Sequence, residues 1–164
     1  MHSHCSLFFS IHQVSHRTDE YEYDVYVAVN LGTFDISDWF YNNLVPELEQ
    51  KSGLRLYARE RDALPGKVTP QGIHSAMNHR RAFLYILDRG FAMSQLNNEE
   101  LEYGIGFAEA RKIPIVIIRP DDTPVKEFSS TARVAIQKYP CFVWNTHRPA
   151  SSFWDDVKEA LKGE

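Results

Sequence analysis

The segment "YDVYVAV" (Tyr23–Val29) decides the fold class, because nearly all of its side chains are apolar and most are β-branched or aromatic. Apolar side chains on both faces of a strand are typical of a parallel sheet that is covered by helices on both sides. The segments "AFLYIL" (Ala82–Leu87) and "IPIVIIR" (Ile113–Arg119) have the same character. All three are therefore predicted to be buried strands.

Helical patterns lie between these segments. Shorter predicted strands, Leu54–Tyr57 and Cys141–Trp144, complete a fivefold alternation of strand and helix. Such alternation predicts a doubly wound α/β domain, in which a five-stranded parallel sheet carries helices on both faces and function lies at the carboxyl ends of the strands. The helices are expected to begin after an N-cap at Ser37, at Pro70 after an N-cap at Thr69, near Asn97, near Phe128, and at Ser152 with Asp155 as its capping-box partner. Pro46 lies inside the first of these helices and is predicted to kink it, because proline removes one backbone donor.

Length and composition indicate one globular domain. A chain of 164 residues with 43% hydrophobic residues can bury a core of its own. Residues 1–22 show no sustained period and are predicted to be a flexible tail or linker, which leaves residues 23–164 as the domain. The net charge of -4 predicts no nucleic-acid partner, and no apolar run reaches the roughly 20 residues of a membrane helix.

Cofactor and metal motifs are weak. Only Gly32 follows the first predicted strand, where a dinucleotide-binding fold would have a glycine-rich loop. Gly104 and Gly106 fall inside a predicted helix and are expected to allow close packing. "HSHC" (His2–Cys5) could bind a metal, although such clusters in tails are usually incidental, so neither a metal nor a resident cofactor is expected. Two cysteines suit a reducing compartment, which predicts a cytoplasmic location.

Three short segments resemble, in order and spacing, the sequence boxes of the Toll/interleukin-1 receptor (TIR) domain family. They are "YDVYVAV", "RDALPGK" (Arg61–Lys67) and the pair Phe153–Trp154. "DWFYNNLVPELE" (Asp38–Glu49) is similar to the family's first helix, which often carries a proline where this chain has Pro46. The resemblance covers Tyr23–Leu161 and implies a flavodoxin-like fold. The ending, Phe142–Leu161, is most similar to animal receptors and adaptors.

The resemblance implies a role in innate-immune signalling through contacts between TIR domains. The loop between the second strand and the second helix is a principal contact in such proteins. In this chain Leu64 would form an apolar tip that Pro65 stiffens and Gly66 turns with a positive φ, within a charged collar. The predicted interface is Arg61, Asp62, Leu64, Pro65, Gly66 and Lys67. The alternative is that Leu64 folds back onto the domain and the loop is a simple connector.

A second implied activity is cleavage of NAD at the nicotinamide bond, with NAD as substrate. Enzymatic members use a glutamate near the start of the third helix, one turn after a tryptophan, and that glutamate corresponds to Glu100. Its carboxylate would stabilise the oxocarbenium-like centre as nicotinamide departs. This chain departs from the pattern at Leu96, where the tryptophan would stand. A structural explanation is also open, because Glu99, Glu100 and Glu102 in a first helical turn would suit the helix dipole.

Overall fold

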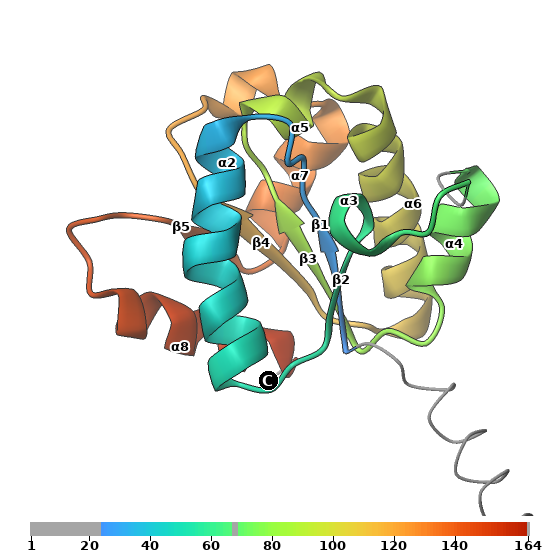
Figure 1. Ribbon diagram of the computed structural model, residues 1–164. Helices are drawn as coiled ribbons and strands as arrows, with labels where there is room; N and C mark the ends of the chain where they lie inside the picture. The colour runs from blue at the N-terminus through green and yellow to red at the C-terminus, as the bar shows by residue number, and fades with distance from the viewer. Residues whose placement is uncertain (1–23, 67–68, 164) are drawn as a thin grey trace, which may run out of the picture.

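Five parallel strands form a single sheet in the order β2-β1-β3-β4-β5 (Figure 1). The computed structural model describes residues 24–66 and 69–163, so the expected tail lies outside the described residues. All four neighbouring pairs are parallel, and the predicted flavodoxin-like α/β architecture is confirmed. The strands are β1 (Val25–Ala28), β2 (Leu56–Ala58), β3 (Ala82–Ile86), β4 (Ile115–Arg119) and β5 (Cys141–Val143).

Alternating side chains of the central strands build two separate cores. In β1, Val25 and Val27 belong to one core, while Tyr26 and Ala28 belong to the other. Strands β3 and β4 divide their side chains in the same way, and the residues of β3 are buried throughout. The apolar character of both strand faces, which is the main signal in the sequence, therefore follows from a sheet enclosed on two sides.

Each core is closed by its own layer of helices (Figure 1). The first layer holds α2 (Phe34–Trp39), the π-helical segments η1 (Phe40–Leu44) and η2 (Pro46–Lys51), and α8 (Ala150–Leu161). The second holds α4 (Pro70–Met77), α5 (Arg89–Met93), α6 (Gln95–Arg111) and α7 (Ser130–Lys138). Two short helices, α3 (Arg59–Asp62) and the 3-10 turn η3 (Val125–Glu127), lie in loops. No helix within residues 24–66 and 69–163 has the length and apolar character needed to cross a membrane.

The first helical run starts earlier than predicted and is wound differently. It begins at Phe34 after Thr33, so Ser37 is not its N-cap. Beyond Trp39 the chain continues as η1 and η2 and Pro46 opens η2, where the sequence predicts a kink in an α-helix. Proline has no amide proton to donate. In a π-helical turn each carbonyl oxygen accepts from the amide five residues further on, whereas in an α-helix it accepts from the amide four residues on.

Two helix starts test the expected caps, and a third helix was not predicted. Thr69 does cap α4, since its Oγ1 accepts from the Gly72 amide at 3.1 Å. The Ser152 cap is wrong, because α8 already starts at Ala150 and Ser152 Oγ instead accepts from Arg148 Nη2 at 3.0 Å. The short helix α5 is absent from the sequence prediction. Asp88 caps it by accepting from the Phe91 amide at 2.9 Å.

The two glycines of α6 differ in their surroundings. A methyl group at Gly104 would overlap the hydroxyl oxygen of Tyr85 on β3, which confirms the close packing expected there. At Gly106 nothing lies within 4 Å of the same position, so that glycine has no packing role of this kind. Gly104 therefore sets how closely α6 approaches the sheet.

Candidate functional site

The β2–α4 loop (residues 59–69) is anchored at its base by the short helix α3. Each of the four residues of α3 has a partner elsewhere in the fold. Glu60 accepts from the Leu31 amide at 2.5 Å, and Asp62 Oδ2 accepts from the Ala58 amide at 2.9 Å. Arg59 and Arg61 make the further contacts that follow. The base of the loop is thus tied to the end of β2 and to the segment after β1.

Arg61 is the main clamp of this base. Its Nη1 and Nη2 donate to the two carboxylate oxygens of Glu49 at 3.0 and 2.9 Å, and Nη2 also donates to the Leu56 carbonyl oxygen at 2.9 Å. Its Nε donates to Asp62 Oδ1 at 2.9 Å. Burial disfavours the charge, but hydrogen bonds to Asp62 and Glu49 outweigh that effect and raise the pKa of Arg61. A bidentate guanidinium pair of this kind is strong and directional.

Two members of the expected charged collar, Arg61 and Asp62, do not surround the tip. Arg61 and Asp62 hold the base of the loop instead of surrounding its tip, because their charged groups face Glu49, the end of β2 and one another. The alternating charges in the sequence do not show whether these side chains anchor the base of the loop or surround its tip. Lys67 lies outside the described residues.

The tip of the loop is exposed. Leu64 is 67% exposed, so the alternative in which it folds back onto the domain is wrong. Pro65 and Gly66 are exposed as well, and Gly66 has the expected positive φ of 83°. Leu64 lies at the edge of a groove of about 610 Å³ whose other walls come mainly from α4, with Tyr57, Thr69, Gln71, Gly72, Ser75, Ala76 and Arg80 among its lining residues.

Glu100 lies deep beneath α3. Its side chain is almost fully buried, and the residue is 2% exposed. Arg59 Nε donates to Oε2 at 3.3 Å, the Tyr26 hydroxyl donates to the same oxygen, and Asn97 Nδ2 donates to Oε1 at 3.0 Å. Helix α6 starts at Gln95 and has no acidic residue in its first turn, so the helix-dipole explanation for Glu100 is wrong.

The Glu100 cluster continues to the loop after β1. Asn30 Nδ2 donates to Asn97 Oδ1 at 2.9 Å and to the Gly90 carbonyl oxygen at 3.3 Å. The sequence prediction named Glu100 and missed Tyr26, Arg59, Asn97 and Asn30. One signal was available in the sequence. Asn97 and Glu100 are three residues apart and so share a helix face, and two polar residues on a face that also packs against the core indicate a buried polar cluster.

Electrostatics in this cluster favour a neutral or paired carboxyl group. Burial raises the pKa of Glu100, although Arg59 and the hydrogen bonds from Tyr26 and Asn97 oppose this effect. Burial and the nearby Glu100 carboxylate also raise the pKa of Tyr26. Both oxygens of Glu100 accept hydrogen bonds within the cluster and the residue is 2% exposed, so a substrate hydroxyl could reach the carboxylate only after the cluster rearranges. Leu96, at the position of the enzymatic tryptophan, packs partly buried against the core.

Comparison with known proteins identifies relatives across nearly the whole domain. The family model described as "TIR domain" matches residues 22–162. Toll-like receptor 9 of Felis catus and that of Homo sapiens are each 30% identical over 151 residues, which is 87% of this chain and 14% of the receptor. The chain thus spans 14% of the length of these curated relatives.

Solved structures share the fold at lower identity. The TIR domain of the Toll-related receptor TRR-2 from Hydra magnipapillata has a TM-score of 0.63 at 19% identity, covering 85% of this chain and 98% of that one. A metazoan TIR-STING receptor from C. gigas, solved with 2',3'-cGAMP, has a TM-score of 0.65 at 16% identity, covering 87% of this chain and 40% of that one. The TIR domains of the activated Roq1 resistosome give 0.56 at 14% identity, covering 85% and 99%.

Proposed function

Because the chain belongs to the TIR domain family, we propose that it assembles with other TIR domains through the β2–α4 loop and transmits an innate-immune signal in the cytosol. Its curated relatives are Toll-like receptors, which supports the signalling role. The observation that carries the proposal is the 67% exposure of Leu64 at the end of a loop whose base is held by paired charges.

The rigidity of the loop base supports an interface. Arg61 joins Glu49 on η2, Asp62 and β2, so association would not have to order this part of the loop. Ordering of flexible segments is one of the main terms that oppose binding, and preorganisation reduces it. The anchored base therefore presents the tip in a fixed position for a partner.

The chemistry of the tip suits a small homotypic interface. An apolar side chain at the centre, surrounded by polar and charged groups, is the usual arrangement of a protein interface. Leu64 and Pro65 provide the apolar centre, and Lys67 adds a positive charge that could fix the register against an acidic group. The proposed partner is a second TIR domain, either another copy of this chain or one in a receptor or adaptor.

Truncation of Leu64 tests the proposal directly. Leu64→Ala and Pro65→His should each raise the dissociation constant for self-association of the full chain at least tenfold, with little change in the melting temperature. Sedimentation velocity measures this constant. Val134→Ala on α7 is a matched control, because Val134 is an apolar residue of similar exposure at 60%. Equal losses in Leu64→Ala and Val134→Ala would remove the loop from the interface, and unfolding of both loop variants would make the loop structural.

Cleavage of NAD is the competing proposal, with Glu100 as the catalytic carboxylate. The position of Glu100 in the cluster under α3 is compatible with an active site only if the cluster rearranges, because Glu100 is 2% exposed and Arg59, Tyr26 and Asn97 already donate to its carboxylate. Assembly through the exposed tip needs no such movement, so it is the better supported function.

A further inference from the structure

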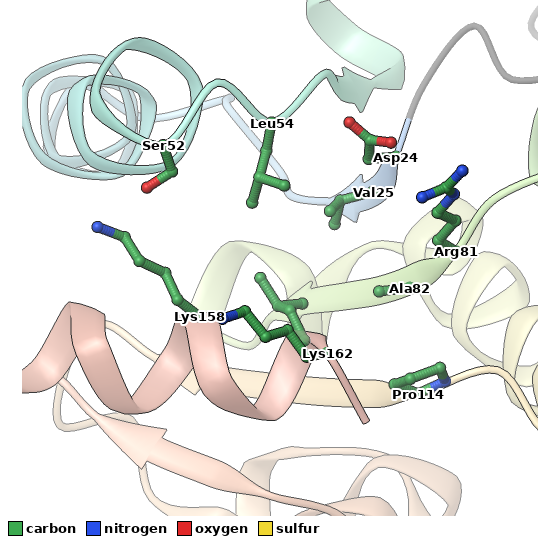
Figure 2. A pocket seen from close by; sticks show the side chains of 10 residues that line it. Asp24, Val25, Ser52, Leu54, Arg81, Ala82, Pro114, Lys158 and Lys162 are labelled. Carbon is green, nitrogen blue, oxygen red and sulfur yellow. The ribbon is translucent and has the colours of Figure 1, made fainter. Parts of the chain in front are cut away.

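A second large groove lies at the amino ends of the strands (Figure 2). Its volume is about 680 Å³. The apolar part of its lining comes from four different segments, the starts of β1, β3 and β4 and the chain before β2, together with the end of α8. These apolar residues are Val25, Leu54, Ala82, Pro114 and Leu161.

The charged lining of the groove is mainly positive. Arg81, Lys158 and Lys162 line it together with one carboxylate, that of Asp24, although the whole chain has a net charge of -4. Figure 2 shows Lys158 and Lys162 on α8, across the groove from Leu54 and Val25. Lys158 Nζ contacts Glu47 Oε2 at 3.4 Å. Asp24 Oδ2 lies 3.8 Å from Arg55 Nε.

The fold holds Lys162 at this groove. Gly163 follows it with a φ of 80°, and a Cβ atom at Gly163 would come within 2.8 Å of the Pro114 ring. The end of α8 thus packs closely against the start of β4. Lysines at a helix C-terminus are favoured by the helix dipole, which accounts for Lys158 and Lys162 in part. Arg81 belongs to a different segment, so the dipole of α8 does not explain the whole set of charges.

We propose that this groove binds the acidic run "DEYE" (Asp19–Glu22) of the same chain. This run supplies three carboxylates for the cations and one aromatic ring, that of Tyr21, for the apolar lining. Opposite charges of this kind fix register and orientation in an interface. The site lies at the edge of the sheet away from the β2–α4 loop, so the inference is independent of the proposed assembly function.

Chain connectivity supports this occupant over an external one. Asp24 lines the groove and is fixed there, because its amide donates to the Arg55 carbonyl oxygen at 2.8 Å and its carbonyl oxygen accepts from the Arg81 amide at 2.9 Å. Glu20 is four residues away, a reach of at most about 14 Å in extended chain. A ligand joined by so short a connection has a high effective concentration at its site.

Charge-reversal substitutions in the full chain test the proposal. In wild type, heteronuclear ¹⁵N relaxation should show residues 19–22 as ordered as β1, with order falling at 0.5 M salt because screening weakens exposed ion pairs. Lys162→Glu should at least halve the ¹H–¹⁵N heteronuclear NOE at residues 19–22, and adding Glu20→Lys should restore it. Lys126→Glu, an equal charge change on η3, is the matched control and should leave the signal unchanged. Lys162→Gln replaces Lys162→Glu if reversal of the charge unfolds the domain.

Three results would overturn the proposal: wild-type residues 19–22 that tumble freely, a relaxation signal that Lys162→Glu does not change, or equal losses in Lys162→Glu and Lys126→Glu. A further arm measures binding to vesicles of phosphatidylcholine and phosphatidylserine in a 3:1 ratio. If residues 19–22 are mobile and Lys162→Glu removes vesicle binding, then the groove meets an external anionic surface and the intramolecular proposal is wrong.

Discussion

Arg59 Nε lies 3.3 Å from Oε2 of Glu100, and both side chains are buried. Arg59 opens α3, at the base of the β2–α4 loop, whereas Glu100 belongs to α6, so this one ion pair connects the proposed interface loop to the second helical layer. Any change in the pair should therefore be felt both in the stability of the domain and in the position of the loop.

A double-mutant cycle on this pair should show strong coupling. Arg59→Met alone leaves the Glu100 carboxylate without its cation and should reduce the free energy of unfolding by about 3–5 kcal/mol. Arg59→Met combined with Glu100→Leu should be less destabilising than the sum of the two single changes, because no buried charge is left unpaired. Urea unfolding of the four proteins measures the coupling. Additive effects would mean that the ion pair contributes nothing of its own.

Incubation of the full chain with NAD should release no more nicotinamide than a Glu100→Gln variant does. Glu100 is 2% exposed and both of its oxygens accept hydrogen bonds, so the carboxylate is not free to meet a substrate. Chromatography of released nicotinamide measures the activity, at low and at high protein concentration because assembly could move α3. Release that depends on Glu100 at either concentration would make the domain an NAD-cleaving enzyme.

Arg61→Lys should loosen the base of the loop. Lysine cannot reproduce the two-oxygen contact with Glu49 together with the bond to the Leu56 carbonyl oxygen. The expected loss is about 1–2 kcal/mol of unfolding free energy, with weaker self-association as well. Arg89→Lys is the matched control, because its pair with Glu127 is exposed and should contribute little. Similar losses in both variants would show that the Arg61 clamp has no special role.

Asp88→Asn should stabilise the domain more, relative to wild type, at neutral pH than at acid pH. Burial raises the pKa of Asp88, against the hydrogen bond from the Phe91 amide, and Asp121 and Glu60 raise it further. A carboxyl group with a raised folded-state pKa adds stability below its unfolded pKa, and that contribution is lost as pH rises through the folded pKa. Asparagine can still accept from Phe91 but does not ionise.

Thermal unfolding at pH 3 and pH 7 measures the effect of Asp88→Asn. The melting temperature of the variant minus that of the wild type should be larger at pH 7 than at pH 3. Asp155→Asn, at an exposed position on α8, serves as the control. A difference that is the same at both pH values would mean that burial of Asp88 does not penalise its charge.

Alanine at the two glycines of α6 should have opposite effects. Gly104→Ala would force the new methyl group against the Tyr85 hydroxyl and should destabilise the domain by about 1–3 kcal/mol. Gly106→Ala meets no neighbour and should stabilise it by about 1 kcal/mol, because alanine is the better helix former. Calorimetry of both variants measures the difference. Two effects of the same sign would contradict the close packing at Gly104.

Much of the fold was predictable from the sequence because the strands are buried on both faces. Tyr26 and Val27 point into different cores, and that leaves a continuous apolar run that is easy to identify. Helix starts were less predictable. Ser152 and Asp155 match a capping box, yet the helix starts at Ala150, since local cap signals are weak beside the packing of Phe153 and Trp154.

The candidate site was predictable in part. The exposed tip at Leu64 follows from local sequence, because a proline and a glycine define the turn. The inward direction of Arg61 does not, since its partner Glu49 lies on a separate helical segment. The surroundings of Glu100 are non-local in the same way. Tyr26 and Arg59 come from β1 and α3, and only the folded chain brings them together.

The place where the chain enters the sheet has a mechanical consequence. Residue 24 leads directly into β1, and β1 is paired in parallel with β2 on one side and β3 on the other. A pull on the chain at that point along the axis of β1 loads both ladders of hydrogen bonds in shear at the same time. Tension in that direction is therefore shared between the two ladders, and the strand is not peeled away one bond at a time.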